Sequence, residues 1–409
     1  MALGQQHENQ AGRYVMSSSH KTSKNLGPRT NIVHSGRHPG ENHGFVNPPV
    51  YHASTIFYPS YEALQEKDAR YVYGRRGTPT MEALEEAVAT LEGGHGAKIC
   101  PSGLSAITTM LLSFLKTGDH LLVTDSTYRP TRSFCDHVLK DLGIETTYYD
   151  PLLGGNIASL FRENTRLVYT ESPGSQTMEV QDIPAIVEAA HARGILVSTD
   201  NTWSGGHYFK AFDHGCDISV QAGTKYIVGH SDAMLGTITV TKEHWPRLDR
   251  YWQLIGSCAG PDDIYLGQRG LRTLDVRLER HMKNTLEIAG WLQGRAEVER
   301  VMYPALPSDP GHEIWKRDYS GASGLFSFVL KPVAEAGVAA FFNTLQFFGM
   351  GYSWGGYESL AVPFDPTSYR TATEWPHEGA GVRLHIGLED VDDLKADLDR
   401  AFAALKASA

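Results

Sequence analysis

Apolar and polar residues follow one another along most of this chain in two alternating periods. Between residues 78 and 241, short apolar runs typical of strands are separated by segments with a helical period. The expected strands are Lys98–Cys100, His120–Thr124, Thr146–Tyr149, Leu167–Thr170, Ile195–Thr199, Ile218–Val220 and Gly236–Thr241. Strands that alternate with helices favour βαβ units. The pattern therefore predicts an α/β fold with a mostly parallel central sheet and helices on both faces.

The helices between these strands have recognisable ends. Thr78 can cap a helix that has Pro79 at its first position, and Gly93-Gly94 can end it. Another helix is expected after Ser102-Gly103, with Ile107, Met110, Leu111 and Phe114 on its buried side, and further helices are expected at Arg132–Leu142 and Ile183–Arg193. After about residue 265 the pattern changes to a charged helix, Gly267–Arg280, a strand-like run, Gly324–Leu330, and an apolar run, Phe341–Phe348. This change predicts a smaller C-terminal α+β domain.

The chain is therefore expected to have three parts, because 409 residues exceed one small core. Residues 1–75 comprise a polar tail, to about residue 30, and an irregular aromatic segment. We interpret that segment as an arm contacting a neighbouring subunit. Residues 76–265 are expected to form a large cofactor-binding domain, and residues 266–409 the C-terminal domain.

Charge and cysteine usage narrow the possible partners. The net charge of −10 and the lack of a basic run argue against nucleic acid or an anionic membrane as partner. Apolar runs are too short for a membrane span, and the N-terminus lacks the apolar core of a signal peptide. The four cysteines are scattered without metal-like pairs, which favours reduced thiols in a cytoplasm and no metal site.

One stretch joins a lysine to an apolar strand through a tight turn. Residues 217–232 read DISVQAGTKYIVGHSD, so Lys225 follows the strand Ile218–Val220 and precedes Tyr226. An isolated lysine is usually a solvated surface charge, but the apolar neighbours favour a dry environment here. Desolvation stabilises the neutral amine, which is the form that makes a Schiff base. The sequence thus predicts that Lys225 binds the aldehyde of a cofactor.

A carboxylate is expected beside this lysine. Asp200 follows the strand Ile195–Thr199, and ligands of parallel sheets bind at the carboxyl ends of the strands. An aspartate at this point can also simply cap the next helix. Together with Lys225, however, it can keep a pyridine nitrogen protonated and so make the ring an electron sink.

Three further positions complete a candidate cofactor site. The turn from Pro101 to Leu104 joins a strand to a helix N-terminus, whose free amides can hold a phosphate. Thr224 offers a hydroxyl next to Lys225 for the same phosphate. Tyr128 follows another strand and can stack on an aromatic ring, although it can equally be a packed core tyrosine.

Five stretches together resemble the pyridoxal-phosphate-dependent enzymes of cysteine and methionine metabolism. They are YGRRGTPT (Tyr73–Thr80), ESPGSQTMEV (Glu171–Val180), VSTDNTW (Val197–Trp203), GTKYIVGHSD (Gly223–Asp232) and GYSWGGYESL (Gly351–Leu360). The resemblance runs from about residue 30 to the C-terminus. It implies the aspartate-aminotransferase-like fold type I and the cofactor pyridoxal 5′-phosphate.

The resemblance also implies roles for individual residues. Lys225, Asp200 and Tyr128 match the Schiff-base lysine, the partner of the pyridinium nitrogen and the tyrosine stacked on the ring. Gly103 and Leu104 match the amides that bind the phosphate, which Thr224 also borders.

Other roles implied by the resemblance concern the substrate and a second subunit. Tyr73 and Arg75 match residues that the adjacent subunit of a homotetramer contributes to the phosphate, and Tyr73 also to substrate and catalysis. Arg383 matches the arginine that binds the substrate α-carboxylate in two-point fashion. A surface salt bridge is the ordinary alternative for such an arginine.

Two features favour the β-lyase branch of this family. ESPGSQ has Ser175 where asparagine is usual, and Ser353-Trp354 has a large residue where γ-acting relatives have a smaller one. The expected reaction is cleavage of the small sulfur amino acid L-cystathionine to homocysteine, pyruvate and ammonia, which serves methionine synthesis.

One position departs from the family pattern. Ala222 stands where a serine is common three residues before the lysine, so one hydroxyl that could bind the phosphate is missing.

Other functions remain open at this point. The nearest is γ-elimination or γ-replacement on the same scaffold, as in a cystathionine γ-lyase, γ-synthase or sulfhydrylase. A catalytically silent pyridoxal-phosphate protein is disfavoured by Lys225, Asp200, Tyr128 and Arg383. A nicotinamide oxidoreductase is disfavoured because no GxGxxG follows the early strands.

Overall fold

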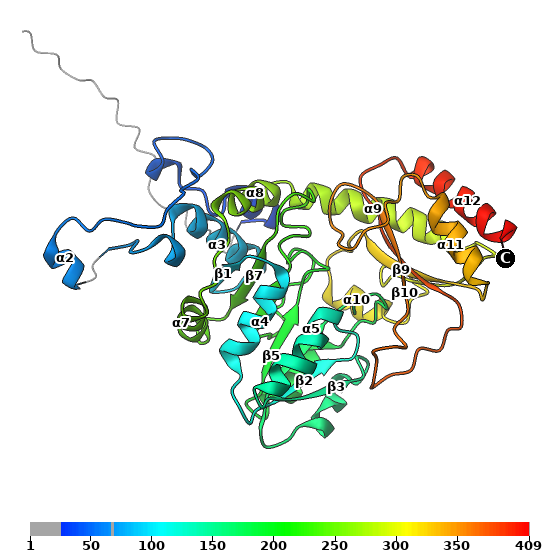
Figure 1. Ribbon diagram of the computed structural model, residues 1–409, viewed down its shortest axis with the longest axis horizontal. Coiled ribbons are helices and arrows are strands. Elements are labelled where there is room, and N and C mark those ends of the chain that lie inside the picture. The colour runs from blue at the N-terminus through cyan, green and yellow to red at the C-terminus, as the bar shows by residue number, and fades with distance from the viewer. Residues whose placement is uncertain (1–25, 67–68, 409) are drawn as a thin grey trace, which may run out of the picture.

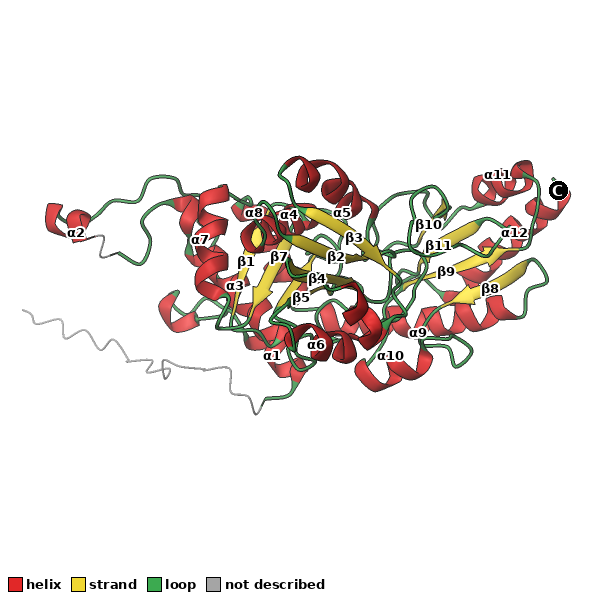
Figure 2. Cartoon of the chain, turned by 90° about the horizontal axis from the view of Figure 1, so that it is seen from below, coloured by secondary structure: helices red, strands yellow, loops and turns green. Residues whose placement is uncertain are grey.

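Two β-sheets organise the protein, whose computed structural model describes residues 26–66 and 69–408. The larger sheet has seven strands in the order β1-β7-β6-β5-β4-β2-β3, and the smaller has four in the order β10-β11-β9-β8. Figures 1 and 2 show the larger sheet in the middle of the molecule and the smaller one beside it near the C-terminus, with the long helix α9 (Leu274–Gln293) running towards the smaller sheet. The expected polar tail falls mostly on residues 1–25, outside the described residues.

The larger sheet confirms the predicted α/β architecture. Its strands are β1 (Gly96–Cys100), β2 (His120–Thr124), β3 (Glu145–Tyr149), β4 (Thr165–Glu171), β5 (Leu196–Asp200), β6 (Ile218–Gln221) and β7 (Gly236–Val240). Strands β6, β5, β4, β2 and β3 pair in parallel, and within this sheet only β7 runs against the others. The sheet is therefore mostly parallel, as the alternating pattern predicts.

Burial on both faces explains why these strands are continuous apolar runs. Neighbouring residues of β2, Leu121 and Leu122, are both fully buried but belong to different cores on opposite faces of the sheet. The helices before, between and after these strands are α3 (Pro79–Glu92), α4 (Gly103–Phe114), α5 (Arg129–Phe134, continued by a π-turn at Cys135–Leu139), α6 (Ile183–His191), α7 (Trp245–Ile255) and α8 (Pro261–Leu271).

Helix ends follow the sequence signals at one place and depart from them at another. The Thr78 hydroxyl accepts a hydrogen bond from the Met81 amide at 3.2 Å and Gly93 is left-handed (φ 80°), which confirms the predicted ends of α3. The expected single helix Gly267–Arg280 was wrong, because α8 ends at Leu271 and α9 begins at Leu274. The carbonyl of Gly270 accepts from the Thr273 amide at 3.1 Å and from the Arg277 guanidinium at 2.8 Å, which closes a turn between the two helices.

The smaller sheet is antiparallel and packs against helices. Its strands are β8 (Val298–Met302), β9 (Leu325–Leu330), β10 (Leu360–Phe364) and β11 (Gly381–His385), and its helices are α10 (His312–Asp318), α11 (Glu335–Thr344) and α12 (Val391–Ala407). Phe341 of α11 packs between Phe328 of β9 and Phe402 of α12, with ring centroids 6.4 and 5.2 Å apart. The exact domain boundaries at residues 75 and 265 stay predictions.

The N-terminal arm extends away from the large sheet. It contains α1 (Pro28–His34), the 3-10 turn Pro39–Glu41, α2 (Tyr61–Glu66) and the 3-10 turn Gly74–Arg76. In Figure 1 the blue segment around α2 runs outward beyond α3, and its aromatic side chains are largely exposed, with Phe57 at 92% and Tyr61 at 71%. Isolated exposed apolar residues are ordinary, but several large ones on one extended arm are typical of a contact surface.

Candidate active site

Four neighbouring strands of the large sheet end at the same edge, and each contributes to one cluster. β6 leads to Lys225, β5 ends at Asp200, β4 ends at Glu171 and β2 leads to Tyr128. Because β6, β5, β4 and β2 are parallel and adjacent, their carboxyl ends lie side by side. The sequence-predicted Lys225, Asp200 and Tyr128 are thus brought together.

Lys225 lies between the two sheets. Its Nζ donates to Ser353 Oγ at 2.6 Å and lies 5.5 Å from the centre of the Trp354 ring. The loop from the smaller half comes so close that a Cβ on Gly355, which is left-handed (φ 89°), would lie 3.0 Å from Lys225 Cα. Burial, and then the positive charge of Arg383, lower the pKa of Lys225 to about 8, although Asp200 opposes this shift.

Asp200 is almost fully buried and well supplied with donors. It accepts from the Thr202 amide at 3.0 Å, from the Thr202 hydroxyl at 2.5 Å and from the Tyr169 hydroxyl at 3.2 Å. Burial raises the pKa of Asp200, while these hydrogen bonds and Lys225 oppose the rise. A buried carboxylate with three donors around it can accept a fourth from a protonated ring nitrogen.

Glu171 is a site residue that the strand pattern did not single out. It pairs in register with Asp200 on the neighbouring strand, and its Oε2 accepts from the Tyr128 amide at 2.7 Å and the Thr127 hydroxyl at 3.3 Å. Burial, and then the charge of Asp200, raise the pKa of Glu171 well above its usual range. The two adjacent carboxyls thus raise each other's cost of ionisation at this end of the sheet. The position of Glu171 directly after the expected strand Leu167–Thr170 is the signal that could have found it.

Tyr128 stands at the N-terminal end of α5 with 44% of its surface exposed. Its backbone amide donates a hydrogen bond to Glu171, which fixes the position of the Tyr128 backbone after the carboxyl end of β2. Burial, and then the charges of Glu171 and Asp200, raise the pKa of Tyr128, while Arg383 opposes this shift. A half-exposed ring next to Asp200 suits stacking on a planar group.

Gly103 and Leu104 are the first two residues of α4. The Ser102 side chain caps this helix by accepting from the Ser105 amide at 3.0 Å, which leaves the amides of Gly103 and Leu104 without partners inside the helix. Glycine is required at position 103, because a Cβ there would lie 2.5 Å from the Ala222 Cβ. This helix end is the part of the site that can receive an anion.

Thr224 lies close by, but its hydroxyl is engaged. Its Oγ1 donates to the Leu235 carbonyl at 3.0 Å and accepts from the Leu235 amide at 2.9 Å. A phosphate would have to compete with Leu235 for the only hydrogen of this hydroxyl.

The smaller half contributes Arg383, Ser353 and Trp354. Arg383 lies in the middle of β11, and its Nη2 donates to the Ser353 carbonyl at 3.0 Å. Burial lowers the pKa of Arg383 to about 10, and within residues 26–66 and 69–408 it forms no ion pair. Ser353 has a left-handed backbone (φ 84°), and Trp354 packs edge-on against Tyr226 with centroids 5.4 Å apart. A left-handed loop residue beside a guanidinium that lacks an ion pair in the described ranges is typical of a binding site.

Tyr73 and Arg75 are not part of this cluster within one chain. Both belong to the arm, where Arg75 Nη1 donates to the Gln253 carbonyl of α7 at 2.8 Å and Tyr73 is 45% exposed. In the described part of the chain, no hydrogen bond or ion pair joins either residue to Lys225 or Arg383. Their predicted role therefore depends on a second subunit.

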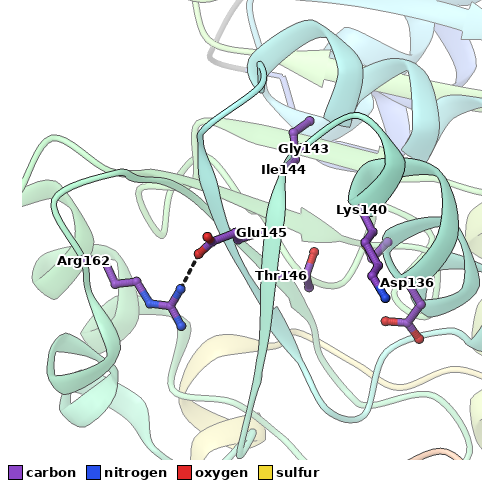
Figure 3. Close-up of a pocket in the computed structure, with 8 residues that line it drawn as sticks. Asp136, Lys140, Gly143, Ile144, Glu145, Thr146 and Arg162 are labelled. Atoms are coloured by element: carbon purple, nitrogen blue, oxygen red, sulfur yellow. Dashed lines mark hydrogen bonds and ion pairs between the residues drawn. The ribbon is translucent and has the colours of Figure 1, made fainter.

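A separate hollow lies at the free edge of the large sheet (Figure 3). It is lined by residues of β3, of the π-turn after α5 and of the loop before β4, including Asp136, Lys140, Glu145 and Arg162. Arg162 and Glu145 pair at 2.6 Å across it. The hollow holds none of the predicted site residues. In the described ranges no cluster of three or more His, Cys, Asp or Glu side chains is placed to hold a metal ion.

The fold and the cluster define a class of enzyme that works through a lysine beside a buried carboxylate and an anion-binding helix end. Residues 29–403 match the family described as Cys/Met metabolism PLP-dependent enzyme. The chain therefore belongs to this family, and pyridoxal phosphate is its cofactor.

Individual relatives agree with this assignment. The chain is 52% identical to a putative cystathionine beta-lyase of Rhizobium johnstonii, with 94% of this chain and 98% of that protein covered. It is 44% identical to cystathionine beta-lyase MetC of Escherichia coli, with 92% and 98% covered. The crystal structure of metB from Corynebacterium glutamicum superimposes with a TM-score of 0.87 at 30% identity, covering 93% of this chain and 99% of that one. The expected fold type I is confirmed.

The residues present fit pyridoxal phosphate. Its phosphate matches the unpaired amides at the start of α4, where a Cβ on Gly103 would collide with Ala222, and its ring nitrogen matches the carboxylate of Asp200. Its aldehyde matches Lys225, whose lowered pKa leaves the amine available.

The pKa of Lys225 gives a first prediction. With a pKa of about 8, roughly a quarter of Lys225 is neutral at pH 7.5, against about 0.1% for an ordinary lysine. Trinitrobenzenesulfonate should modify Lys225 in cofactor-free protein with a rate that rises with pH around a midpoint of about 8. Peptide mapping locates the modified residue, and N-acetyl-lysine amide is the reference. A midpoint at the value of that reference would contradict the dry environment of Lys225.

Proposed function

We propose that this protein is a carbon–sulfur β-lyase that cleaves L-cystathionine to homocysteine, pyruvate and ammonia. The observation that carries the proposal is the meeting of Lys225 with Ser353, Trp354 and Arg383 between the two sheets. The names of the two relatives at 52% and 44% identity support the same substrate. Because homocysteine is the precursor of methionine, this reaction would serve methionine biosynthesis.

Substrate binding falls to Arg383. It is half-buried and forms no ion pair in the described part of the chain, so its charge is free for the α-carboxylate of an amino acid. One of its terminal nitrogens is held by the Ser353 carbonyl at 3.0 Å, which orients the planar guanidinium for two-point contact. The α-carbon of the substrate is thereby directed towards Lys225.

Proton transfer falls to Lys225, assisted by Tyr128 or by Tyr73 of a second subunit. When bound, pyridoxal phosphate supplies an aldehyde that joins to an amine and a ring that withdraws electrons from the α-carbon. The carboxylate of Asp200 would accept a hydrogen bond from the protonated ring nitrogen, and Tyr128 would stack on the ring. The neutral Nζ of Lys225 then accepts the proton of the α-carbon. The Cβ–S bond then breaks, and the ammonium of Lys225 returns its proton to the leaving sulfur, which departs as the thiol homocysteine. One water hydrolyses the remaining three-carbon fragment to pyruvate and ammonia.

Trp354 is the residue proposed to favour β over γ chemistry. Its ring lies 5.5 Å from Lys225 Nζ and is braced by Tyr226. A large wall at this point limits how far the substrate side chain extends from the lysine, so Cβ rather than Cγ stays in reach. The alternative is γ-elimination or γ-replacement on the same residues.

Product analysis tests the function. Purified protein loaded with pyridoxal phosphate is incubated with L-cystathionine, and the keto acid is identified by mass spectrometry. Pyruvate with an equal amount of homocysteine supports β-cleavage. Formation of 2-oxobutyrate and cysteine would assign γ-elimination instead, and no product at all with cofactor bound would leave a silent pyridoxal-phosphate protein.

The quaternary structure and location are further parts of the proposal. A homotetramer built from two active dimers would cover the exposed aromatic arm and bring Tyr73 and Arg75 to a neighbouring site. The four cysteines are free, which suits a reducing cytoplasm. None of the helices in residues 26–66 and 69–408 is long and apolar enough to span a bilayer.

A shared site predicts complementation between inactive subunits. Arg75→Ala and Lys225→Ala are each expected to abolish most activity. A mixed oligomer contains sites with Lys225 from one chain and Arg75 from the other, so one such site per pair is intact. Co-expression with two different affinity tags and purification through both should recover up to about a quarter to a half of the wild-type rate. Verified mixed oligomers that stay inactive would argue against the shared site.

A further inference from the structure

A segment of the smaller half reaches across to the large sheet next to the active site. It joins β10 to β11, and its residues 369–373, which we call the strap, lie against the loops that follow β2 and β4. Two buried or half-buried carboxylates of the large half, Asp125 and Glu179, hold it. The proposed mechanism uses neither of them.

Asp125 is the first anchor. It directly follows β2, is fully buried and accepts five hydrogen bonds. Three come from the successive strap amides of Thr371, Ala372 and Thr373 at 3.1, 3.1 and 2.9 Å, and one from the Thr373 hydroxyl at 2.7 Å. The fifth comes from the Arg132 guanidinium. A carboxylate surrounded in this way caps the strap as an anion caps a helix terminus.

Glu179 is the second anchor, on the loop after β4. Arg370 of the strap binds its carboxylate in two-point fashion at 2.8 and 3.2 Å and also contacts the Thr177 hydroxyl. The Tyr369 hydroxyl donates to Gln176 Oε1 at 2.7 Å, and the Arg129 guanidinium lies 5.7 Å from the centre of the Tyr369 ring. The strap is therefore fixed at both ends.

The contacts at Asp125 hold the chain both before and after Tyr128. Asp125 precedes Tyr128 by three residues, and Arg132 follows it by four and contacts the same carboxylate. Between these two residues, the Tyr128 amide donates a hydrogen bond to Glu171 Oε2. We infer that Asp125, through the strap, is a positioning residue that fixes Tyr128 for stacking on the cofactor ring. This inference rests on the role proposed for Tyr128.

The charge of Asp125 is what the strap depends on. Burial alone would raise the pKa of this carboxyl, but the hydrogen bonds from Thr371 and Thr373 and the charge of Arg132 hold it below its usual value. Asparagine has nearly the same shape, yet one of its two polar atoms is an NH2 group. That group would face N–H donors on either side, so Asp125→Asn leaves buried donors unpaired.

Hydrogen exchange tests the first half of the inference. In the cofactor-loaded Asp125→Asn protein, the amides of the strap should exchange at least about tenfold faster than in the wild type. Asp365→Asn is the matched control. Asp365 is exposed on the same connection and caps only the Thr367 amide and hydroxyl, at 2.9 and 2.7 Å, so its replacement should leave the strap amides unchanged. Unchanged strap exchange in folded Asp125→Asn would overturn the anchor. Thr373→Val, which removes one of the five donors, should shift exchange in the same direction by less and serves if Asp125→Asn does not fold.

A double-mutant cycle tests the second half. The rate at which the visible band of bound pyridoxal phosphate is lost after dilution into cofactor-free buffer should rise about tenfold in Asp125→Asn. In a Tyr128→Ala background the same substitution should change that rate less than about twofold, because the residue through which it acts is gone. An equal effect in both backgrounds would make Asp125 a purely structural residue. Pyruvate formation by the wild type is scored separately, so failure of the proposed reaction leaves both readouts interpretable.

Discussion

Replacing Lys225 with alanine is expected to lower kcat for carbon–sulfur cleavage at least about a thousandfold. Removing the amine would take away both the group proposed to join the cofactor aldehyde and the base proposed to accept the α-proton. The fold should survive, because the Nζ makes a single hydrogen bond, to the exposed Ser353. A steady-state assay of pyruvate formation measures the effect, and the thermal midpoint checks the fold.

Borohydride reduction shows whether Lys225 is the lysine in question. In the wild type, reduction should fix the cofactor to the peptide that contains Lys225 and to no other. Lys242→Ala, an exposed lysine just after β7, is the matched control and should retain both activity and the reduced adduct. The assignment of Lys225 would be wrong if the Lys225→Ala protein still formed the same reducible lysine adduct at wild-type yield.

The sequence predicted most of the large sheet because its strands are buried on both faces. β2 was predicted with its exact bounds, and both ends of every other strand of this sheet were predicted to within two residues. Continuous apolar runs bounded by glycine or polar residues are a strong local signal when helices cover both sides of a sheet. The same reasoning placed Lys225 and Asp200 near one another, since residues at the carboxyl ends of parallel strands meet at one edge.

The residues that the sequence did not reveal are those whose roles depend on contacts between distant segments. Asp125 contacts amides of residues 371 to 373, almost 250 positions away. No local period carries that information, and an aspartate after a strand resembles an ordinary cap. Glu171 was within reach of the strand-end rule, but its raised pKa arises from burial and then from the charge of Asp200 on the neighbouring strand, which the local sequence does not show.

The break between α8 and α9 illustrates a tertiary contact that overrides a local preference. The residues from Gly267 to Arg280 have a helical period, but Gly270 lies against the Val228 carbonyl, where a Cβ would come within 2.1 Å. Arg277 then reaches back to the Tyr226 carbonyl at 2.7 Å, so the chain turns to support the segment that carries Lys225. The break between the two helices therefore results from contacts with the backbone next to Lys225, which the local helical period does not show.

Arg383→Lys is expected to lower kcat/KM for L-cystathionine by about ten- to a hundredfold. Lysine keeps a positive charge but loses the planar two-point geometry, and a charged hydrogen bond is worth roughly 1.5–3 kcal/mol. Each 1.36 kcal/mol corresponds to about tenfold in rate. Burial lowers the pKa even of the arginine here, so a lysine ammonium at this position also loses part of its charge near neutral pH.

The visible band of bound cofactor should persist in Arg383→Lys, because Arg383 is proposed to bind the substrate alone. Arg300→Lys, a half-buried arginine in β8 of the same small sheet, is the matched control and should leave kcat/KM within about twofold. A substrate analogue tests whether the effect comes from carboxylate binding. An analogue in which an amide replaces the α-carboxylate should be bound equally weakly by the wild type and by Arg383→Lys. An unchanged kcat/KM would make Arg383 a structural arginine that holds the Ser353 carbonyl, and the carboxylate would then have to be bound by another cation of the site.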